Sequence, residues 1–92
     1  MHALFVVSEI DTNRSTEAED QLKNVVAPQV KQAPGLVRAT WGRSADGSEG
    51  RSVVVFETEE AARGMLAAVK AMPPDGPVKI LSASVLEIVL EL

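Results

Sequence analysis

The segment Pro34–Ala62, PGLVRATWGRSADGSEGRSVVVFETEEAA, decides the fold. Pro34 cannot continue a helix and Gly35 tolerates a positive φ angle, so the pair marks a helix end followed by a turn. Residues 36–41 and 52–56 are rich in β-branched and aromatic side chains, which is typical of strands. Between them, Asp46–Gly47 is a strong turn signal. The segment therefore predicts two antiparallel strands joined by a polar hairpin loop.

Downstream of this hairpin the sequence predicts a helix and then a last strand. Thr58 is a good N-cap, and the two glutamates after it suit the first turn of a helix over residues 59–72. The proline-rich segment Pro73–Pro77 then forms a stiff turn. Residues 78–92 are predicted to form the last strand, since side chains on alternating faces are apolar in its second part. Fifteen residues is long for one strand, so Ser82–Ser84 is expected to hold a bend or bulge.

Upstream of the hairpin the sequence predicts a first strand and a first helix. His2–Ile10 carries apolar residues at both parities, which is typical of a central strand covered on two sides. Residues 15–33 have apolar side chains three and four apart, and either Ser15 or Thr16 could cap this helix. Pro28 removes one backbone hydrogen bond, so the helix should kink or divide near residues 24–26.

The predicted order is βαββαβ within a single domain, residues 1–92, of class α+β. This is the ferredoxin-like pattern, with a four-stranded antiparallel sheet of order 4-1-3-2 and both helices on one face. The other face would keep several apolar side chains exposed, more than a soluble monomer normally shows. A second copy of the chain would cover it, which predicts a homodimer. These side chains are drawn from Phe5, Val7, Val53, Val55, Val85 and Val89. The long last strand could also cross to the partner's sheet and extend it.

Composition excludes several function classes. The 92 residues include no cysteine, which leaves neither disulfides nor thiolate metal sites and suits a reducing cytoplasm. A formal net charge of −4 argues against nucleic acid and anionic membranes as partners. No apolar run approaches the ~20 residues of a membrane span. The chain is therefore expected to be a cytoplasmic protein without a metal or cofactor.

Together with the C-terminal run PVKILSASVLEIVLEL, the Pro34–Ala62 segment resembles the dimeric α/β-barrel superfamily. Within it, the chain is most similar to the small antibiotic-biosynthesis-monooxygenase-like proteins. The resemblance covers nearly the whole chain and implies pairing of two subunits into a barrel. Members of the family include cofactor-independent monooxygenases of polycyclic phenols and haem-degrading enzymes. The latter need an axial histidine near the second helix, and none occurs between Glu59 and Pro77, which disfavours haem degradation.

Four residues are candidates for ligand binding, while no catalytic residue can be assigned. Trp41 is either a core or dimer contact on an edge strand, or the wall of a pocket that stacks on a planar ligand. Arg38 points to the other face, where it either pairs with a carboxylate or clamps an anionic ligand. Glu9 and Glu87 lie on neighbouring strands, so they either end those strands in solvent or share one pocket. His2, the only histidine, is expected to be frayed and exposed.

Two functions follow from these observations. The scarcity of titratable groups at interior positions favours a dimeric module that binds a small hydrophobic ligand or has a structural role. The alternative is a cofactor-independent monooxygenase acting on an aromatic or polyketide-like substrate. In that case the substrate would occupy a cavity between sheet and helices, reached beside Trp41. No phosphate loop, metal-ligand spacing or nucleophile motif points elsewhere.

Overall fold

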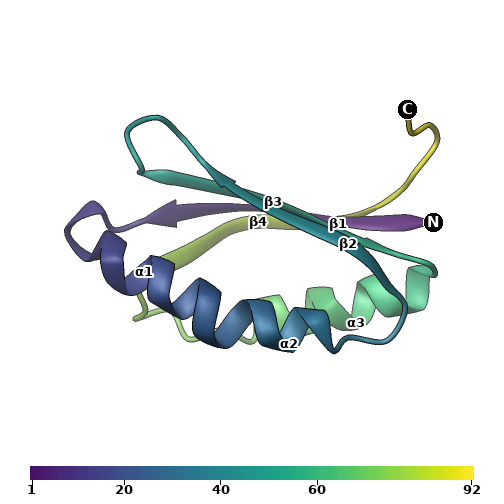
Figure 1. The fold of residues 1–92 in the computed structure, drawn as a ribbon, viewed down its shortest axis with the longest axis horizontal. Helices are drawn as coiled ribbons and strands as arrows, with labels where there is room; N and C mark the ends of the chain where they lie inside the picture. Colours follow the sequence, from purple (N-terminus) through teal and green to yellow (C-terminus); the bar gives the residue numbers. More distant parts are fainter.

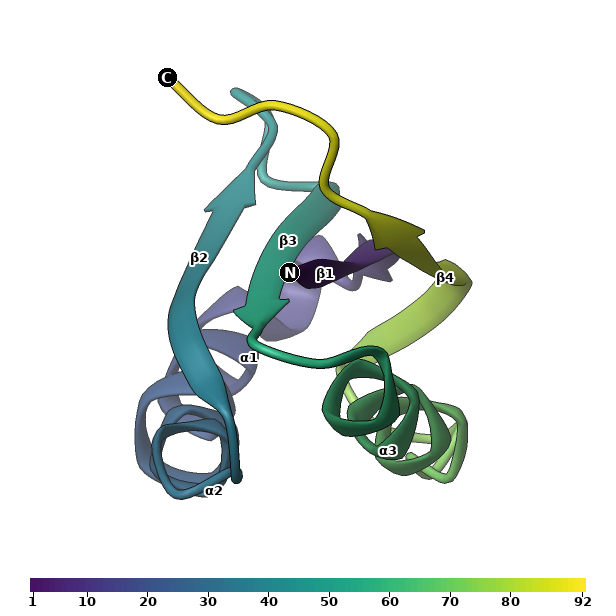
Figure 2. The same ribbon diagram turned by 90° about the vertical axis from the view of Figure 1, so that its right-hand side faces the viewer.

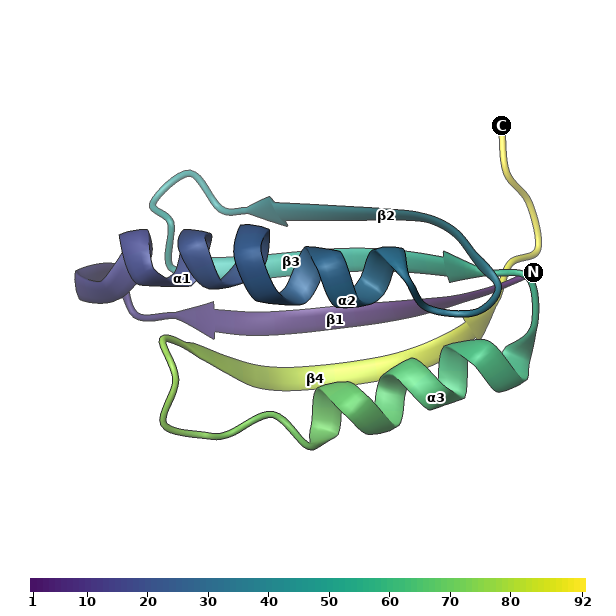
Figure 3. The same ribbon diagram turned by 60° about the horizontal axis from the view of Figure 1, so that its bottom comes forward.

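The computed structural model describes residues 1–92 and arranges four antiparallel strands in one sheet of order β2-β3-β1-β4. All helices lie on one face of this sheet (Figure 1, Figure 3). The predicted βαββαβ order, the strand order and the placement of the helices are confirmed. In the single subunit the sheet stays open and does not close into a barrel. The elements are β1 (His2–Ile10), α1 (Ser15–Gln21), α2 (Ala27–Lys31), β2 (Leu36–Arg43), β3 (Glu49–Phe56), α3 (Glu59–Lys70) and β4 (Val78–Glu87).

The β2–β3 hairpin is closed by a hydrogen-bonded turn. Gly47 adopts a φ of 77°, which an L side chain would resist. Asp46 Oδ1 accepts hydrogen bonds from Ser48 N at 3.0 Å, Ser48 Oγ at 2.7 Å and Ser44 Oγ at 2.7 Å. These bonds favour the ionised carboxylate, with the backbone bond from Ser48 the largest cause, and lower the pKa of Asp46 from 3.8 to about 2. The loop is therefore a defined turn.

The first helical segment begins earlier than the capping motif predicts. A 3-10 turn spans Thr12–Arg14, and its cap is Asp11, whose side chain accepts from Asn13 N at 3.0 Å. The prediction that Ser15 or Thr16 caps the helix is therefore wrong. Asp11 is held in place by the sheet end, since its own N–H donates to the Pro77 carbonyl at 2.9 Å. This long-range bond turns the chain before the local motif does.

Pro28 divides the first helix, as predicted. A π-helical turn, Leu22–Val26, separates α1 from α2 immediately before the proline. Proline cannot donate the N–H that the α-helical pattern needs four residues after Asn24. Widening the turn is a common local adjustment to such a break. The segment still runs as one nearly continuous helix across the sheet (Figure 1).

The second half of the chain follows its predicted pattern as far as Glu87, where β4 ends; the prediction that the last strand continues to Leu92 is wrong for residues 88–92. Thr58 caps α3, with its hydroxyl accepting from Ala61 N at 3.1 Å. The irregularity expected in the last strand is a register shift, because Val7 pairs with Ser82 while Ser8 pairs with Ile80. Leu81 is thus the extra residue, one position before the predicted bend. No helix combines the length and apolar character needed to cross a bilayer.

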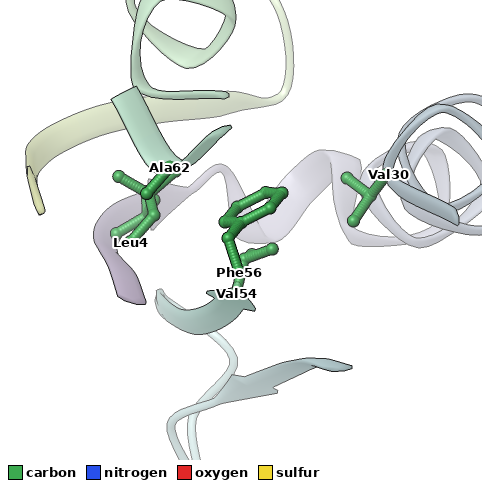
Figure 4. Close-up of a cluster of buried hydrophobic side chains, with 6 residues drawn as sticks. Leu4, Val30, Val54, Phe56 and Ala62 are labelled. Carbon is green, nitrogen blue, oxygen red and sulfur yellow. The ribbon is translucent and has the colours of Figure 1, made fainter. Parts of the chain in front are cut away.

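The core lies between the sheet and the helices. Its buried side chains come from both central strands and both helical segments (Figure 4). Phe56 and Leu4 are at most 1% exposed, and Ala62 of α3 lets that helix approach them closely. Val85 packs against this core and therefore belongs to the helix-facing side of the sheet. The buried cluster is Leu4, Val6, Val30, Val54, Phe56 and Ala62.

The outward face of the sheet is apolar and only partly covered. Phe5 and Leu86 remain 41% and 48% exposed on it. Residues 88–92 leave the sheet and pass above this face (Figure 2). Ile88 N donates to the Met1 carbonyl at 3.0 Å, and Glu91 pairs with Arg38 at 2.5 Å. The chain end thus shields one end of the face and leaves the rest open.

Candidate functional site

A cleft of about 880 Å³ lies between the sheet and the helices. It exists because α1 and α2 cover the β2 side of the sheet while α3 packs on β4 and β1 (Figure 2). The predicted cavity between sheet and helices is therefore present, and Trp41 lines it. Of its 29 lining residues, 17 are hydrophobic. A concave, mostly apolar site of this volume is typical of small-molecule binding.

Two cross-strand rows form the cleft floor near the hairpin. In the first row Arg43 pairs with Gly50, and Gly50 pairs with Ser8. In the second row Trp41 pairs with Ser52, and Ser52 pairs with Val6. All six residues line the cleft. The indole and the guanidinium thus come from the edge strand, and two hydroxyls come from the central strands beside them.

The contact between Gly50 and Ser8 shapes this floor. Ser8 is 9% exposed, and its hydroxyl donates to the Gly50 carbonyl at 3.3 Å. A Cβ atom at position 50 would lie 2.5 Å from Ser8 Oγ, well inside van der Waals contact. Only glycine leaves room for the hydroxyl there. The floor therefore carries no side chain at position 50, directly beside Arg43.

The charged residues at the rim are mostly paired. Lys23 Nζ lies 3.4 Å from Glu19 Oε1, and Arg51 Nε lies 3.0 Å from Glu49 Oε2. Arg43, by contrast, has no carboxylate oxygen within 4.0 Å, since it takes part in none of the six ion pairs of the chain. The guanidinium of Arg43 is therefore the cation at this cleft that is free to meet a ligand.

The proline-rich loop borders the same end of the cleft on the β4 side, since Asp11 N donates to the Pro77 carbonyl and Ile10 N donates to the Ser48 carbonyl of the hairpin loop (Figure 3). Arg14 donates to the Asp75 carbonyl at 3.2 Å and also forms an ion pair with Glu17. The hydrogen bond with Glu17 raises the pKa of Arg14 above its ordinary value. Arg14 thus ties the start of α1 to the loop that precedes β4. Met72, Pro73 and Val78 of this region line the cleft.

Of the sequence candidates, Trp41 alone lies at the cleft. It is half-buried against the core and its other surface lines the cleft, so the core-contact and pocket-wall interpretations both hold. Arg38 lies on the outward face, where Glu91 engages it. That pairing matches the carboxylate-paired interpretation within the subunit.

Glu9 and Glu87 do not share a pocket. Glu87 pairs with His2 at the start of β1, whereas Glu9 lies at the far end of that strand beside Glu49 and Lys79. Glu9 lies seven positions after His2, about 23 Å along a strand. The two carboxylates also point to opposite faces of the sheet. Glu87 shares the face of its partner His2, and His2 and Glu9 are an odd number of positions apart on β1, so they face opposite sides. The hypothesis of a joint site is wrong for the single subunit, and neither residue lines the cleft.

His2 is ordered, which contradicts the expectation of a frayed terminus. It pairs with Phe56 and Glu87 within the sheet. Its side chain is 23% exposed, and Nε2 lies 3.7 Å from Glu59 Oε1. Nδ1 is buried and has no hydrogen-bond partner. The imidazole does not line the cleft, so it takes no part in the chemistry of that site.

Sequence analysis missed Arg43, Ser52 and the Gly50–Ser8 contact. Arg43 carries a signal that could have found it, because it shares the parity of Trp41 and must face the same side of the sheet. Ser52 and Ser8 carry no such signal. Their importance depends on the register between strands, which brings residues 42 positions apart into contact.

The fold and the cleft define a ferredoxin-like α+β protein with a helix-covered ligand-sized cavity. No family model and no curated protein matches the sequence. Among solved structures, the chain is similar to a dimeric ferredoxin-like protein from an uncultured marine organism, with 13% identity and a TM-score of 0.71. That alignment covers 100% of this chain and 98% of the other.

Two solved enzymes share the fold. The monooxygenase ActVA-Orf6 of Streptomyces coelicolor, solved in complex with nanaomycin D, aligns at 19% identity and a TM-score of 0.65 over 99% of this chain and 89% of its own. The heme degrader MhuD of Mycobacterium tuberculosis, with two hemes in its active site, aligns at 21% identity and a TM-score of 0.68. The alignment covers 100% of this chain and 99% of MhuD. At these identities the likeness shows a common fold.

Proposed function

We propose that the chain is a small cytoplasmic binding module whose cleft takes an apolar small molecule. The cleft itself carries the proposal, because about 880 Å³ of mostly apolar space persists beside a compact core. An aromatic wall, Trp41, and two floor hydroxyls, Ser8 and Ser52, supply the few polar and aromatic contacts that orient ligands in sites of this kind. The cysteine-free sequence suits a reducing compartment.

The groups that line the cleft favour binding over catalysis. They include no histidine, aspartate or cysteine, and the lining carboxylate, Glu19, is engaged by Lys23 at the rim. General acid–base catalysis near neutral pH needs a group that exchanges a proton there. The serine hydroxyls can hydrogen-bond a ligand but have no base beside them. Positioning an apolar molecule is therefore the chemistry these residues perform best.

Two copies of the chain would pair through the outward face of the sheet. Phe5 and Leu86 are large, apolar and close to half-exposed on that face, and Val89, Leu90 and Leu92 of the chain end are 91%, 74% and 116% exposed. Contiguous apolar surface of this kind marks an interface in soluble proteins. A two-fold pairing buries the same patch on both copies, and the structural relative from the marine organism is itself described as dimeric.

Ligand binding is tested with a neutral fluorescent probe and a pair of neighbouring substitutions. N-phenyl-1-naphthylamine brightens in apolar sites, and we expect it to bind once per chain. Ala68 and Ala67 are both exposed on α3, but Ala68 alone lines the cleft. Ala68→Phe should abolish saturable probe binding, while Ala67→Phe should leave it unchanged. Equal binding by both variants would refute the proposed site.

Pairing is tested by light scattering at micromolar concentration. Phe5→Glu places a charge on the outward face and should convert a dimer into monomers. Val25→Glu is the matched control, because Val25 is 48% exposed on the helix side and lies away from that face. A wild-type protein that scatters as a monomer would refute the pairing.

A cofactor-independent monooxygenase is the second candidate, favoured by Trp41 at the cleft and the fold shared with ActVA-Orf6. The reaction to test converts a ring CH₂ of an anthrone into C=O, with the second oxygen atom of O₂ leaving as water. Oxygen uptake that requires an open cleft, and so is lost in Ala68→Phe and kept in Ala67→Phe, would support it. Uptake no faster than the uncatalysed rate would leave binding as the function.

A further inference from the structure

We propose that the cleft selects an apolar ligand that bears one acidic group, and that Arg43 pairs with this group. The inference rests on the proposed binding function and specifies its ligand class. It starts from the position of Arg43 at the end of β2, on the same side of the sheet as Trp41. A guanidinium offers a planar set of donors that matches a carboxylate, sulfonate or phenolate oxygen.

The surroundings of Arg43 give the cleft one polar corner. Its cross-strand neighbour is Gly50, which has no side chain, and the next residue in the row is Ser8. Ser52 lies in the adjacent row, beside Trp41, and its hydroxyl makes no hydrogen bond within the protein. A ligand head group above Gly50 would therefore find a cation on one side and a free hydroxyl close by. The rest of the floor is mostly apolar, and the helical walls combine apolar side chains with Gln21, Gln29 and the paired Glu19 and Lys23.

The charges around the cleft favour a ligand head group with a negative charge. The other two cations that line the cleft, Lys23 and Arg51, are each neutralised by a glutamate within 4.0 Å. Glu19 is the one lining carboxylate, and it is the partner of Lys23. Arg43 is left as an unpaired positive charge beside an apolar cavity. A cationic ligand would be repelled at this corner, while a neutral one would gain nothing from it.

The strength of the ion pair between Arg43 and an acidic ligand group depends on how exposed Arg43 is. Arg43 is exposed at the rim, so solvent screens its interaction, and exposed ion pairs are worth only ~0.2–1 kcal/mol. The planar guanidinium geometry and the neighbouring hydroxyl place this pair toward the upper end of that range and beyond it. We therefore expect an acidic group to strengthen binding about threefold to tenfold.

Two probes with the same aromatic skeleton isolate this contribution. N-phenyl-1-naphthylamine is neutral, and 1-anilinonaphthalene-8-sulfonate adds one sulfonate. Titrations of both probes are run on the wild type, on Arg43→Gln and on Arg63→Gln. Arg63 is the control because it is an exposed arginine of α3 that does not line the cleft, so its removal changes net charge equally.

We expect the sulfonate probe to bind about threefold to tenfold more tightly than the neutral one to the wild type and to Arg63→Gln. Arg43→Gln should remove that difference and leave neutral-probe binding unchanged. Added salt should weaken only the sulfonate probe. Should the neutral probe bind in the cleft while the sulfonate gives no Arg43-dependent gain, the inference is overturned and the binding function stands. If Ala68→Phe fails to displace either probe, the binding function itself is wrong.

Discussion

Gly50→Ala should destabilise the protein through a single clash that a second substitution removes. The new Cβ would lie 2.5 Å from Ser8 Oγ and 3.4 Å from Ile10 Cδ1, and every other heavy atom is at least 3.7 Å away. Ordinary contact begins near 3.4 Å, so the hydroxyl must move by about 1 Å. Moving it breaks its hydrogen bond to the Gly50 carbonyl.

The magnitude combines three contributions. Overpacking of a buried site costs ~1–3 kcal/mol, and a lost hydrogen bond costs ~0.5–1.5 kcal/mol. Replacing glycine recovers ~0.5–1 kcal/mol by restricting the unfolded chain. The net expectation is a loss of about 2 kcal/mol in the free energy of unfolding, within a range of about 0.5–4 kcal/mol. Ser8→Ala removes the clashing atom, so Gly50→Ala in that background should be nearly neutral.

The measurement is a double-mutant cycle of urea unfolding. Far-UV circular dichroism and the fluorescence of Trp41, the only tryptophan, report the transition. Protein concentration is held fixed because pairing of subunits would link stability to it. A coupling energy of about 2 kcal/mol between positions 8 and 50 is expected. Additive effects of the two substitutions would show that the close approach does not constrain this floor.

Three further changes test other parts of the fold. Gly64→Ala should raise the free energy of unfolding by ~0.5–1 kcal/mol, because alanine favours the helix more than glycine does and the new Cβ would meet no atom within 4 Å. A lower free energy of unfolding, measured in urea, would contradict this. Thr58→Ala should cost ~1 kcal/mol as a lost N-cap, and an unchanged midpoint would argue against the cap. Because hydrogen bonds lower the folded pKa of Asp46 to about 2, its stabilisation is present above the unfolded pKa and is lost as pH falls from about 4 to about 2. Asp46→Asn should remove that part of the pH dependence of stability. An Asp46 carboxyl that titrates near pH 4 in the folded protein, measured by NMR, would refute the lowered pKa.

The order of helices and strands could be predicted because it depends on local sequence patterns, namely hydrophobic periodicity and turn residues. Trp41 was expected to be either a core or dimer contact or the wall of a pocket, and Pro28 was expected to break the first helix because it lacks an N–H. The start of that helix was not predicted correctly, because Asp11 caps a 3-10 turn that leads directly into α1 before Thr16. His2 likewise appeared terminal in sequence yet lies inside the sheet, paired with Phe56.

The sequence by itself determined the βαββαβ order, which side chains of a strand share a face, and that both faces of the sheet are apolar, since periodicity is a property of neighbouring residues. Only the tertiary structure decided which polar groups gather at the cleft. The register between β2, β3 and β1 places Arg43 beside Gly50 and Ser8, and it sends Glu9 and Glu87 to opposite ends of β1. The hairpin turn fixes the β2–β3 register locally, but the pairing of β1 with β3 and β4 joins residues far apart in the chain, so no local pattern encodes it.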